Sequence, residues 1–481
     1  MYVTYEQFGV DLTGVNASDT QMKACHDFAN THGLKVIQKS GVVRWQNLPI
    51  EVKTDCDLAG LKVILGPTSG STISAYSHPA VFHIARTAPP IELCATEIAN
   101  LVVNHSDEIK KGSQRISHPD FIARPNCLAV IRGSFMDIMR NGTTPIKAQA
   151  VIFLGRAGNF VGVLDRDFTQ GIESVRFYPR EESRLTFKPP CFELDGVVSV
   201  CCVLIERNQT TLTGFVSKEI GTPMTTIRQL VTVRDCYDVC LDDMETEAQA
   251  PGPSGSYGLR VDSVYDLRVR GMRGFGGWGV TGTNYMIKAL FEDCCINRFD
   301  AHWMGYDIDL SRCELVNRGC NVAGGGYFRA INCTMVITDY DNTIDGIGPF
   351  FDVKTDYGCE FDGLVVVRDL VVRIGEGYGL ANVSGTTNLT VVRIGNPISY
   401  NPGREVWLPQ LVRIDGVTVI APPSLGSEQP FTLTGVQKNI ASTLSGHAVH
   451  APTLDRLYVA SLGYLHPVVG RDLRTRVTLG I

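Results

Sequence analysis

A three-residue pattern recurs along the second half of the chain and constrains its fold more than any other feature. Each copy is a mostly polar dipeptide followed by a small or aliphatic residue, with strand-like apolar residues on both sides. The copies are Arg234-Asp235-Cys236, Tyr265-Asp266-Leu267, Glu292-Asp293-Cys294, Ser311-Arg312-Cys313, Ile331-Asn332-Cys333 and Arg368-Asp369-Leu370. Their last residues are 31, 27, 19, 20 and 37 positions apart. A parallel β-helix tolerates such variable spacing, because loops can grow at the corners while the stacked strands stay in register.

The third residue of each copy is predicted to point into the core, while the dipeptide faces outward. We expect one stacked column, made of Cys236, Leu267, Cys294, Cys313, Cys333 and Leu370. A propeller would need a more regular period of about 40 to 50 residues, and a sandwich would need frequent hairpin turns. The pattern therefore predicts an all-β protein, a right-handed single-stranded parallel β-helix.

The rest of the chain is expected to complete this architecture. Ser18-Asp19-Thr20-Gln21 fits a capping box, apolar residues follow at helical spacing, and Gly33 stands where a helix would end. We expect residues 1–65 to form this capping helix and the first strands, and residues 66–190 to form an inserted, irregular small β domain. Residues 191–400 are predicted to be the main β-helix with a glycan-binding groove, and residues 401–481 the last coils and the C-terminal region.

Composition and charge exclude several functional classes. The formal net charge is −6 and there is no Lys/Arg-rich run, so nucleic acid is not an expected partner. The first residues lack the basic and apolar regions of a secretion signal, and no run of about 18 apolar residues predicts a membrane span. The 15 cysteines are odd in number and include adjacent pairs, which favours buried apolar roles over disulfides. They also lack convincing zinc-ligand spacing, so no metal site is expected.

Three segments resemble bacteriophage tailspikes and tail-associated polysaccharide depolymerases with a pectate-lyase-like β-helix. They are Phe8–Thr20 before the capped helix, Pro145–Leu194 in the inserted region, and Ile296-Asn297-Arg298-Phe299-Asp300-Ala301-His302-Trp303 before another coil. The resemblance implies a homotrimer in the virion tail, with other phage tail proteins as partners. It also implies a bacterial surface polysaccharide as substrate and no cofactor.

Glycoside hydrolysis needs two carboxyl groups on either side of the scissile bond. Counting six residues beyond the core column gives Asp242, Arg273, Asp300, Gly319 and Asp339. Asp300 and Asp339 would then lie two coils apart, at about 9.5 Å, which suits an inverting hydrolase. We expect Asp300 to be the base, with a pKa lowered by Arg273, and Asp339 to be the acid. His302 is predicted to carry a proton or to donate to a sugar hydroxyl, although it could instead be a buried histidine bonded within a turn.

Substrate binding is expected from Arg298, Arg273, Trp303, Tyr306 and Trp278, whose aromatic members could pack against sugar rings. Arg298 could bind a substrate carboxylate or merely pair with Asp300. Two other functions stay open. A polysaccharide lyase would use His302 or Tyr306 as base, with Arg298 neutralising a uronic acid, and a non-catalytic adhesin would bind the glycan without cutting it.

Overall fold

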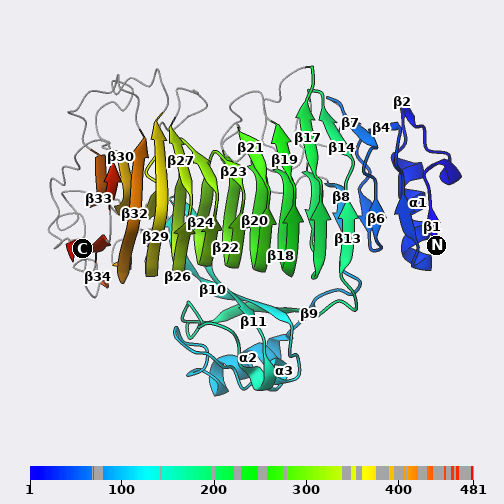
Figure 1. Ribbon diagram of the computed structural model, residues 1–481. Coiled ribbons are helices and arrows are strands. Elements are labelled where there is room, and N and C mark those ends of the chain that lie inside the picture. The colour runs from blue at the N-terminus through cyan, green and yellow to red at the C-terminus, as the bar shows by residue number, and fades with distance from the viewer. Residues whose placement is uncertain are drawn as a thin grey trace.

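The computed structural model describes the chain outside residues 68, 70–79, 141–142, 197–200, 222–228, 248–256, 276–278, 338–347, 354–359, 375–388, 395–405, 408, 421–430, 437–448, 451–456, 460–461, 465–477 and 480–481. Parallel strands stack side by side along one long axis, with a helix at the N-terminal end (Figure 1). A small domain of helices and antiparallel strands, coloured in cyan shades, projects from the side of the stack.

The stack begins with β1 (Tyr2–Val3), η1 (Glu6–Phe8), β2 (Thr13–Ala17), α1 (Asp19–His32), β3 (Lys35–Ile37), β4 (Val42–Trp45), β5 (Ile50–Val52), β6 (Cys56–Asp57), β7 (Lys62–Leu65) and β8 (Ala80–Ile84). After the small domain it continues with β13 (Leu185–Lys188), β14 (Cys191–Leu194), β15 (Cys201–Ile205), β16 (Thr210–Thr213), β17 (Val216–Glu219), β18 (Gln229–Asp242), β19 (Glu245–Glu247), β20 (Tyr257–Arg270), β21 (Arg273–Phe275), β22 (Gly279–Glu292), β23 (Cys295–Ile296), β24 (Phe299–Ser311), β25 (Glu314–Val316), β26 (Cys320–Ile331), β27 (Thr334–Ile337), β28 (Phe351–Val353) and β29 (Phe361–Ile374). The last strands are β30 (Leu389–Ile394), β31 (Val406–Trp407), β32 (Leu411–Ile420), β33 (Phe431–Val436), β34 (Val449–His450), β35 (Leu457–Val459), β36 (Leu462–Tyr464) and β37 (Thr478–Leu479).

Strands of the stack pair in parallel with strands one coil away. β18 pairs with β20, β20 with β22, β22 with β24, and β24 with β26. Inward side chains of successive coils form one continuous apolar cluster along this part of the chain. The predicted parallel β-helix is confirmed.

The recurring sequence pattern marks the corners of the coils. The middle residues of all six copies have positive φ: 50° at Asp235, 57° at Asp266, 54° at Asp293, 52° at Arg312, 54° at Asn332 and 54° at Asp369. Asp and Asn enter this left-handed region more readily than most residues, which explains why they predominate in the pattern. The residue after each corner turns inward and is buried, as predicted.

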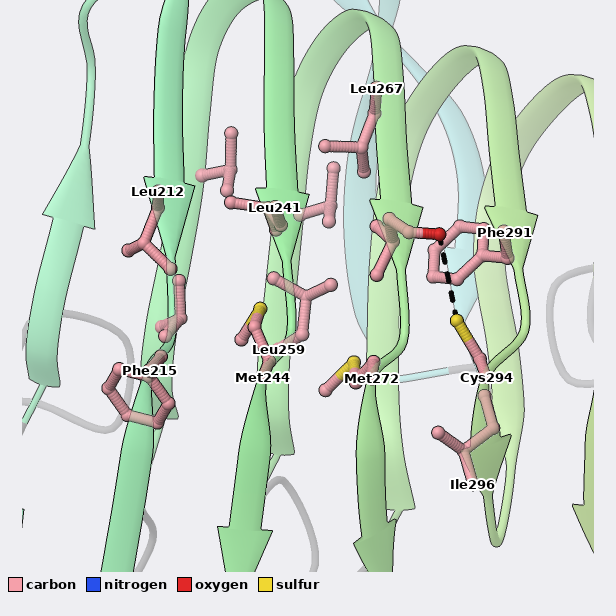
Figure 2. Packing of buried hydrophobic residues seen from close by; sticks show 14 of the residues in the cluster. Leu212, Phe215, Leu241, Met244, Leu259, Leu267, Met272, Phe291, Cys294 and Ile296 are labelled. Atoms are coloured by element: carbon pink, nitrogen blue, oxygen red, sulfur yellow. Dashed lines mark hydrogen bonds between the residues drawn. The ribbon is translucent and has the colours of Figure 1, made fainter. Parts of the chain in front are cut away.

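The predicted single column is wrong for the first two copies. Cys294, Cys313, Cys333 and Leu370 do share one column. Cys236 instead aligns with Val264 on the next coil, and Leu267 aligns with Ala289. Met244 and Met272 fill the column before Cys294, and Figure 2 shows these three side chains in one row with Leu267 in a different position.

The physical reason is that a coil has several corners of the same kind. Asp235 lies at one corner, Asp266 at a second, and Asp293 at a third. Each corner needs a residue that tolerates positive φ followed by an inward apolar residue. The local sequence therefore shows that a corner is present but not which corner it is.

The capping helix forms where it was predicted, as α1, and Gly33 ends it with a φ of 65°. The capping box does not form, because the Ser18 hydroxyl accepts a hydrogen bond from the Asp11 backbone N–H instead. The Asp19 carboxylate accepts hydrogen bonds from the backbone N–H groups of Gln46, Asn47 and Leu48. This contact ties the helix to the first coils.

The inserted domain is shorter than the predicted range 66–190 and is not purely β. It contains β9 (Ile91–Glu92), α2 (Ala95–Asn104), α3 (Pro119–Ile122), β10 (Leu128–Arg140), β11 (Thr144–Phe153), η2 (Arg156–Gly158) and β12 (Ile172–Tyr178). Its sheet has the order β11-β10-β12-β9 and covers an apolar core of its own. β8 and β13 lie within the predicted range but pair with strands of the β-helix. Apolar residues of β10 and β11 pack against a row of aromatic side chains on the β-helix.

Among the helices of the described residues, none is long and apolar enough to cross a membrane.

Candidate functional site

The segment singled out by the sequence forms a polar cluster on the outside of the β-helix. In β24, Phe299 and Ala301 point into the core, so Asp300 between them points outward. Arg298 forms an ion pair with Asp300, and His302 Nε2 lies 3.4 Å from Asp300 Oδ2. We call Tyr257, Arg298, Asp300 and His302 the Asp300 cluster.

Glycines make room for this cluster. The Tyr257 hydroxyl lies 3.0 Å from Nε2 of His302, although the backbone of His302 is two coils further along the stack. To reach it, the Tyr257 ring crosses Gly282, where an added Cβ would lie 2.4 Å from a ring carbon. The Arg298 side chain similarly lies against Gly279, 3.0 Å from the position of an added Cβ.

Burial limits what the Asp300 cluster can do. Asp300 is 0% exposed, Arg298 is 3% exposed and His302 is 7% exposed. A sugar cannot reach the carboxylate of Asp300 in this conformation. Catalysis by Asp300 itself stays a prediction, and its burial favours a role in holding Arg298 and His302.

The counted column of carboxylates needs correction. The neighbour of Asp300 on β26 is Asn321, and the neighbour of Asn321 on β28 is Asp352. Asp352 thus occupies the position expected for Asp339, which lies outside the described residues. Gly319 precedes the aligned residue Cys320, and its carbonyl accepts a hydrogen bond from the Phe299 N–H.

Arg273 and Asp242 also lie elsewhere. Arg273 is exposed on β21, where it aligns with Glu245 and Cys295, so it does not lie next to Asp300 as predicted. Asp242 forms an ion pair with Arg270 at 2.8 Å, near another corner. Both errors follow from the wrong column, because the count began at residues of two other corners.

Two of the predicted aromatic platforms, Trp303 and Tyr306, pack against the inserted domain. Trp303 is 1% exposed, and the Arg166 guanidinium from the inserted domain lies 5.0 Å from its ring centroid. Tyr306 packs against the same interface, where burial raises the pKa of its hydroxyl. Trp278 lies outside the described residues. Trp303 and Tyr306 therefore attach the inserted domain in this structure.

A second polar cluster, which the sequence interpretation missed, lies where β10 and β11 meet the β-helix. We call Arg132, Gln149, Asp235, Asp262 and Ser263 the corner cluster. Gln149 Nε2 donates to the Ser263 hydroxyl at 2.7 Å, and Arg132 Nε donates to Gln149 Oε1 at 3.1 Å. The Gln149–Ser263 bond joins the inserted domain to the β-helix, and the Arg132–Gln149 bond links β10 and β11 within the inserted domain.

The carboxylates of the corner cluster differ from Asp300 in exposure. Asp235 and Asp262 are both partly exposed. Burial, and next the charge of Asp262, raise the pKa of Asp235 to about 6. Burial also raises the pKa of Asp262, against the lowering effect of Arg260 and Arg132. Asp235 was visible in the sequence only as a corner residue, and nothing local distinguished it from the other corner aspartates.

Within the described residues, no group of three or more His, Cys, Asp and Glu side chains could hold a metal ion.

Comparison with known proteins now bears on the function. No family model matches the chain. The tailspike protein gp49 of Pseudomonas phage LKA1 superposes over 97% of this chain and 83% of its own, with a TM-score of 0.53 and 14% identity. The tailspike gp61 of Pseudomonas phage phi297 covers 96% and 80%, with a TM-score of 0.50 and 10% identity. The chain has the fold of a phage tailspike.

A sequence relative supports the same resemblance. A depolymerase of a Klebsiella phage, described as specific for the KL64 capsule, is 28% identical over 137 residues. The match covers 27% of this chain and 13% of that protein, so this chain spans only a small part of its relative. The resemblance to tailspike depolymerases is confirmed.

Proposed function

We propose that this chain acts in a phage virion tail as a tailspike that binds and cleaves a bacterial surface polysaccharide, either capsule, exopolysaccharide or O-antigen. The tailspike fold and the similarity to a capsule depolymerase support this function. The cleavage is endo-glycosidic hydrolysis by two carboxyl groups. The working form is a homotrimer attached to other tail proteins.

One observation carries the hydrolytic assignment: carboxylates lie on the outward side of alternate coils. Asp262 belongs to β20, Asp300 to β24 and Asp352 to β28. Parallel strands are about 4.8 Å apart, so carboxylates spaced by one or two strands fall in the range that glycosidases use. Asp300 and Asp352 align through Asn321, whereas Asp262 is offset from this row by two residues and is the partly exposed member.

The Asp300 cluster serves this reaction by positioning His302. Asp300 pairs with Arg298 and lies 3.4 Å from the His302 ring, while Tyr257 contacts the same ring nitrogen. The ring is thereby held in one orientation, from which it donates a hydrogen bond to a sugar hydroxyl. A lyase is less well supported, because Arg298, the group expected to neutralise a uronic acid, is buried against Asp300.

The test is to incubate the chain with a panel of purified bacterial polysaccharides and to size the products. Shorter chains without absorbance near 232 nm are expected. Absorbance there would indicate an unsaturated product and therefore a lyase. A polysaccharide that binds but keeps its length would indicate an adhesin and would contradict the proposed function.

A further inference from the structure

Asp235 and Asp262 lie diagonally across two adjacent coils. Asp262 aligns with Arg234 on β18, and Asp235 is the next residue, at a corner where its φ is 50°. Adjacent parallel strands are about 4.8 Å apart, and the carboxyl groups of retaining glycosidases are about 5 to 5.5 Å apart. One strand across and one residue along separate the two backbone positions by about 6 Å, from which the carboxyl groups can approach the separation of a retaining pair.

The inserted domain provides a polar wall beside this pair. Arg132 and Gln149 face each other across β10 and β11, and Gln149 is fixed to Ser263, the residue after Asp262. Arg132 is exposed. Its hydrogen bond within the described residues leaves from Nε, so its two terminal nitrogens can donate to a ligand.

The two carboxyl groups have different surroundings. Asp262 is approached by Arg260 at 3.4 Å and by the Ser263 hydroxyl at 3.4 Å, contacts that favour its ionised form. Within the described residues, the carboxylate of Asp235 has no hydrogen bond, although the guanidinium of Arg86 binds its backbone carbonyl. Burial raises the pKa of Asp235 to about 6, and it also raises the pKa of Asp262, where the charges of Arg260 and Arg132 oppose the rise. Such a difference is how two carboxyl groups acquire separate acid and nucleophile roles.

We propose that Asp235 is the general acid and Asp262 the nucleophile of the glycan cleavage, with Arg132 of the inserted domain as a substrate contact. This inference rests on the proposed function and names the residues that perform it. The Asp300 cluster lies two coils further on, about 9.6 Å along the axis.

The reaction has two balanced steps. In the first, an Asp262 oxygen attacks the anomeric carbon and forms an ester bond while the glycosidic C–O bond breaks. The electron pair of that bond goes to the glycosidic oxygen, which takes the proton of Asp235. In the second, a water oxygen attacks the anomeric carbon as Asp235 takes one proton from that water. The ester bond breaks, its electron pair returns to Asp262, and the new sugar end keeps the original anomeric configuration.

The experiment uses the whole chain and a polysaccharide that the wild type cleaves. Asp235→Asn and Asp262→Asn should each slow cleavage by roughly 10² to 10⁴-fold while glycan binding is kept. Arg132→Ala should weaken binding. The matched controls are Asp369→Asn, at an exposed corner with a φ of 54°, and Asp242→Asn, at a strand end paired with Arg270. Both controls should cleave at the wild-type rate.

One further measurement needs only the wild-type protein, and a second itself reports whether the variant is folded. Proton NMR of freshly released ends should show retained configuration with the wild-type protein. Azide should restore cleavage by Asp262→Ala and give a glycosyl azide of inverted configuration, because the small anion replaces the missing nucleophile. Full activity of Asp235→Asn or Asp262→Asn, or an inverted wild-type product, would overturn this inference and leave the proposed function standing. A wild-type chain that cleaves no polysaccharide in a broad panel would overturn both.

Discussion

Replacing Asp235 by Asn should stabilise the folded chain at neutral pH. The folded state raises the pKa of Asp235 from 3.8 to about 6, mainly by burial. A raised pKa means that the folded chain holds this proton more tightly than the unfolded chain does. Below about pH 4 both states are protonated, and there is no penalty. Between about pH 4 and 6 the unfolded state loses its proton first, so the wild type loses stability as the pH rises, and above about pH 6 the loss is complete.

The size of this effect follows from the same values. The full difference between 3.8 and about 6 would correspond to roughly 3 kcal/mol, at about 1.4 kcal/mol per pKa unit. Asp235 is partly exposed, and solvent screening reduces this to about 1 kcal/mol. Asn keeps the shape of the side chain, tolerates positive φ and does not titrate in this range. The stability of the variant relative to the wild type should therefore rise by about 1 kcal/mol between pH 4 and pH 7.

Urea unfolding followed by tryptophan fluorescence at several pH values measures this difference. Because both proteins share all their other titrating groups, the effects of those groups largely cancel. Asp369→Asn is the control, since it makes the same change at an exposed corner with a similar φ. A gain that does not depend on pH, or an Asp235→Asn variant that is less stable than the wild type at pH 7, would refute the reasoning.

Three further outcomes are expected. Asp300→Asn should slow cleavage on the order of 10²-fold by misplacing His302. The double variant Asp300→Asn/His302→Ala should be no slower than His302→Ala alone, and additive losses of the cleavage rate would contradict a positioning role. Gly282→Ala should displace the Tyr257 ring, since the new Cβ would lie 2.4 Å from a ring carbon. Loss of the hydrogen bond between Tyr257 and His302 should lower the free energy of unfolding by about 0.5 to 1.5 kcal/mol, which thermal unfolding measures while cleavage is assayed in parallel. Light scattering should give the mass of a trimer, and a monomer at micromolar concentration would contradict that assembly.

The sequence was sufficient to predict the type of fold. Corner residues and the inward residues after them are chosen by local physics, namely the tolerance of Asp and Asn for positive φ and the burial of a small apolar side chain. These requirements appear directly in the residues, so Asp293, Arg312 and Asn332 marked true corners. The capping helix was predictable for the same reason, because its apolar spacing and Gly33 are local signals.

Only the tertiary structure decided which residues meet. Cys236 and Cys294 follow corners of identical local chemistry, yet they lie in different columns, because loop lengths between strands set the register and leave no mark in the triplet itself. The length of chain between β27 and β28 similarly hid that Asp352 lies two coils from Asp300. The contact of Gln149 with Ser263 joins residues 114 positions apart, through an inserted domain whose docking depends on shape. The sequence by itself determined a coil with aspartates at its corners. Folding decided that the Asp235 carboxyl holds its proton more tightly than usual, because desolvation depends on neighbours that only the tertiary structure brings together.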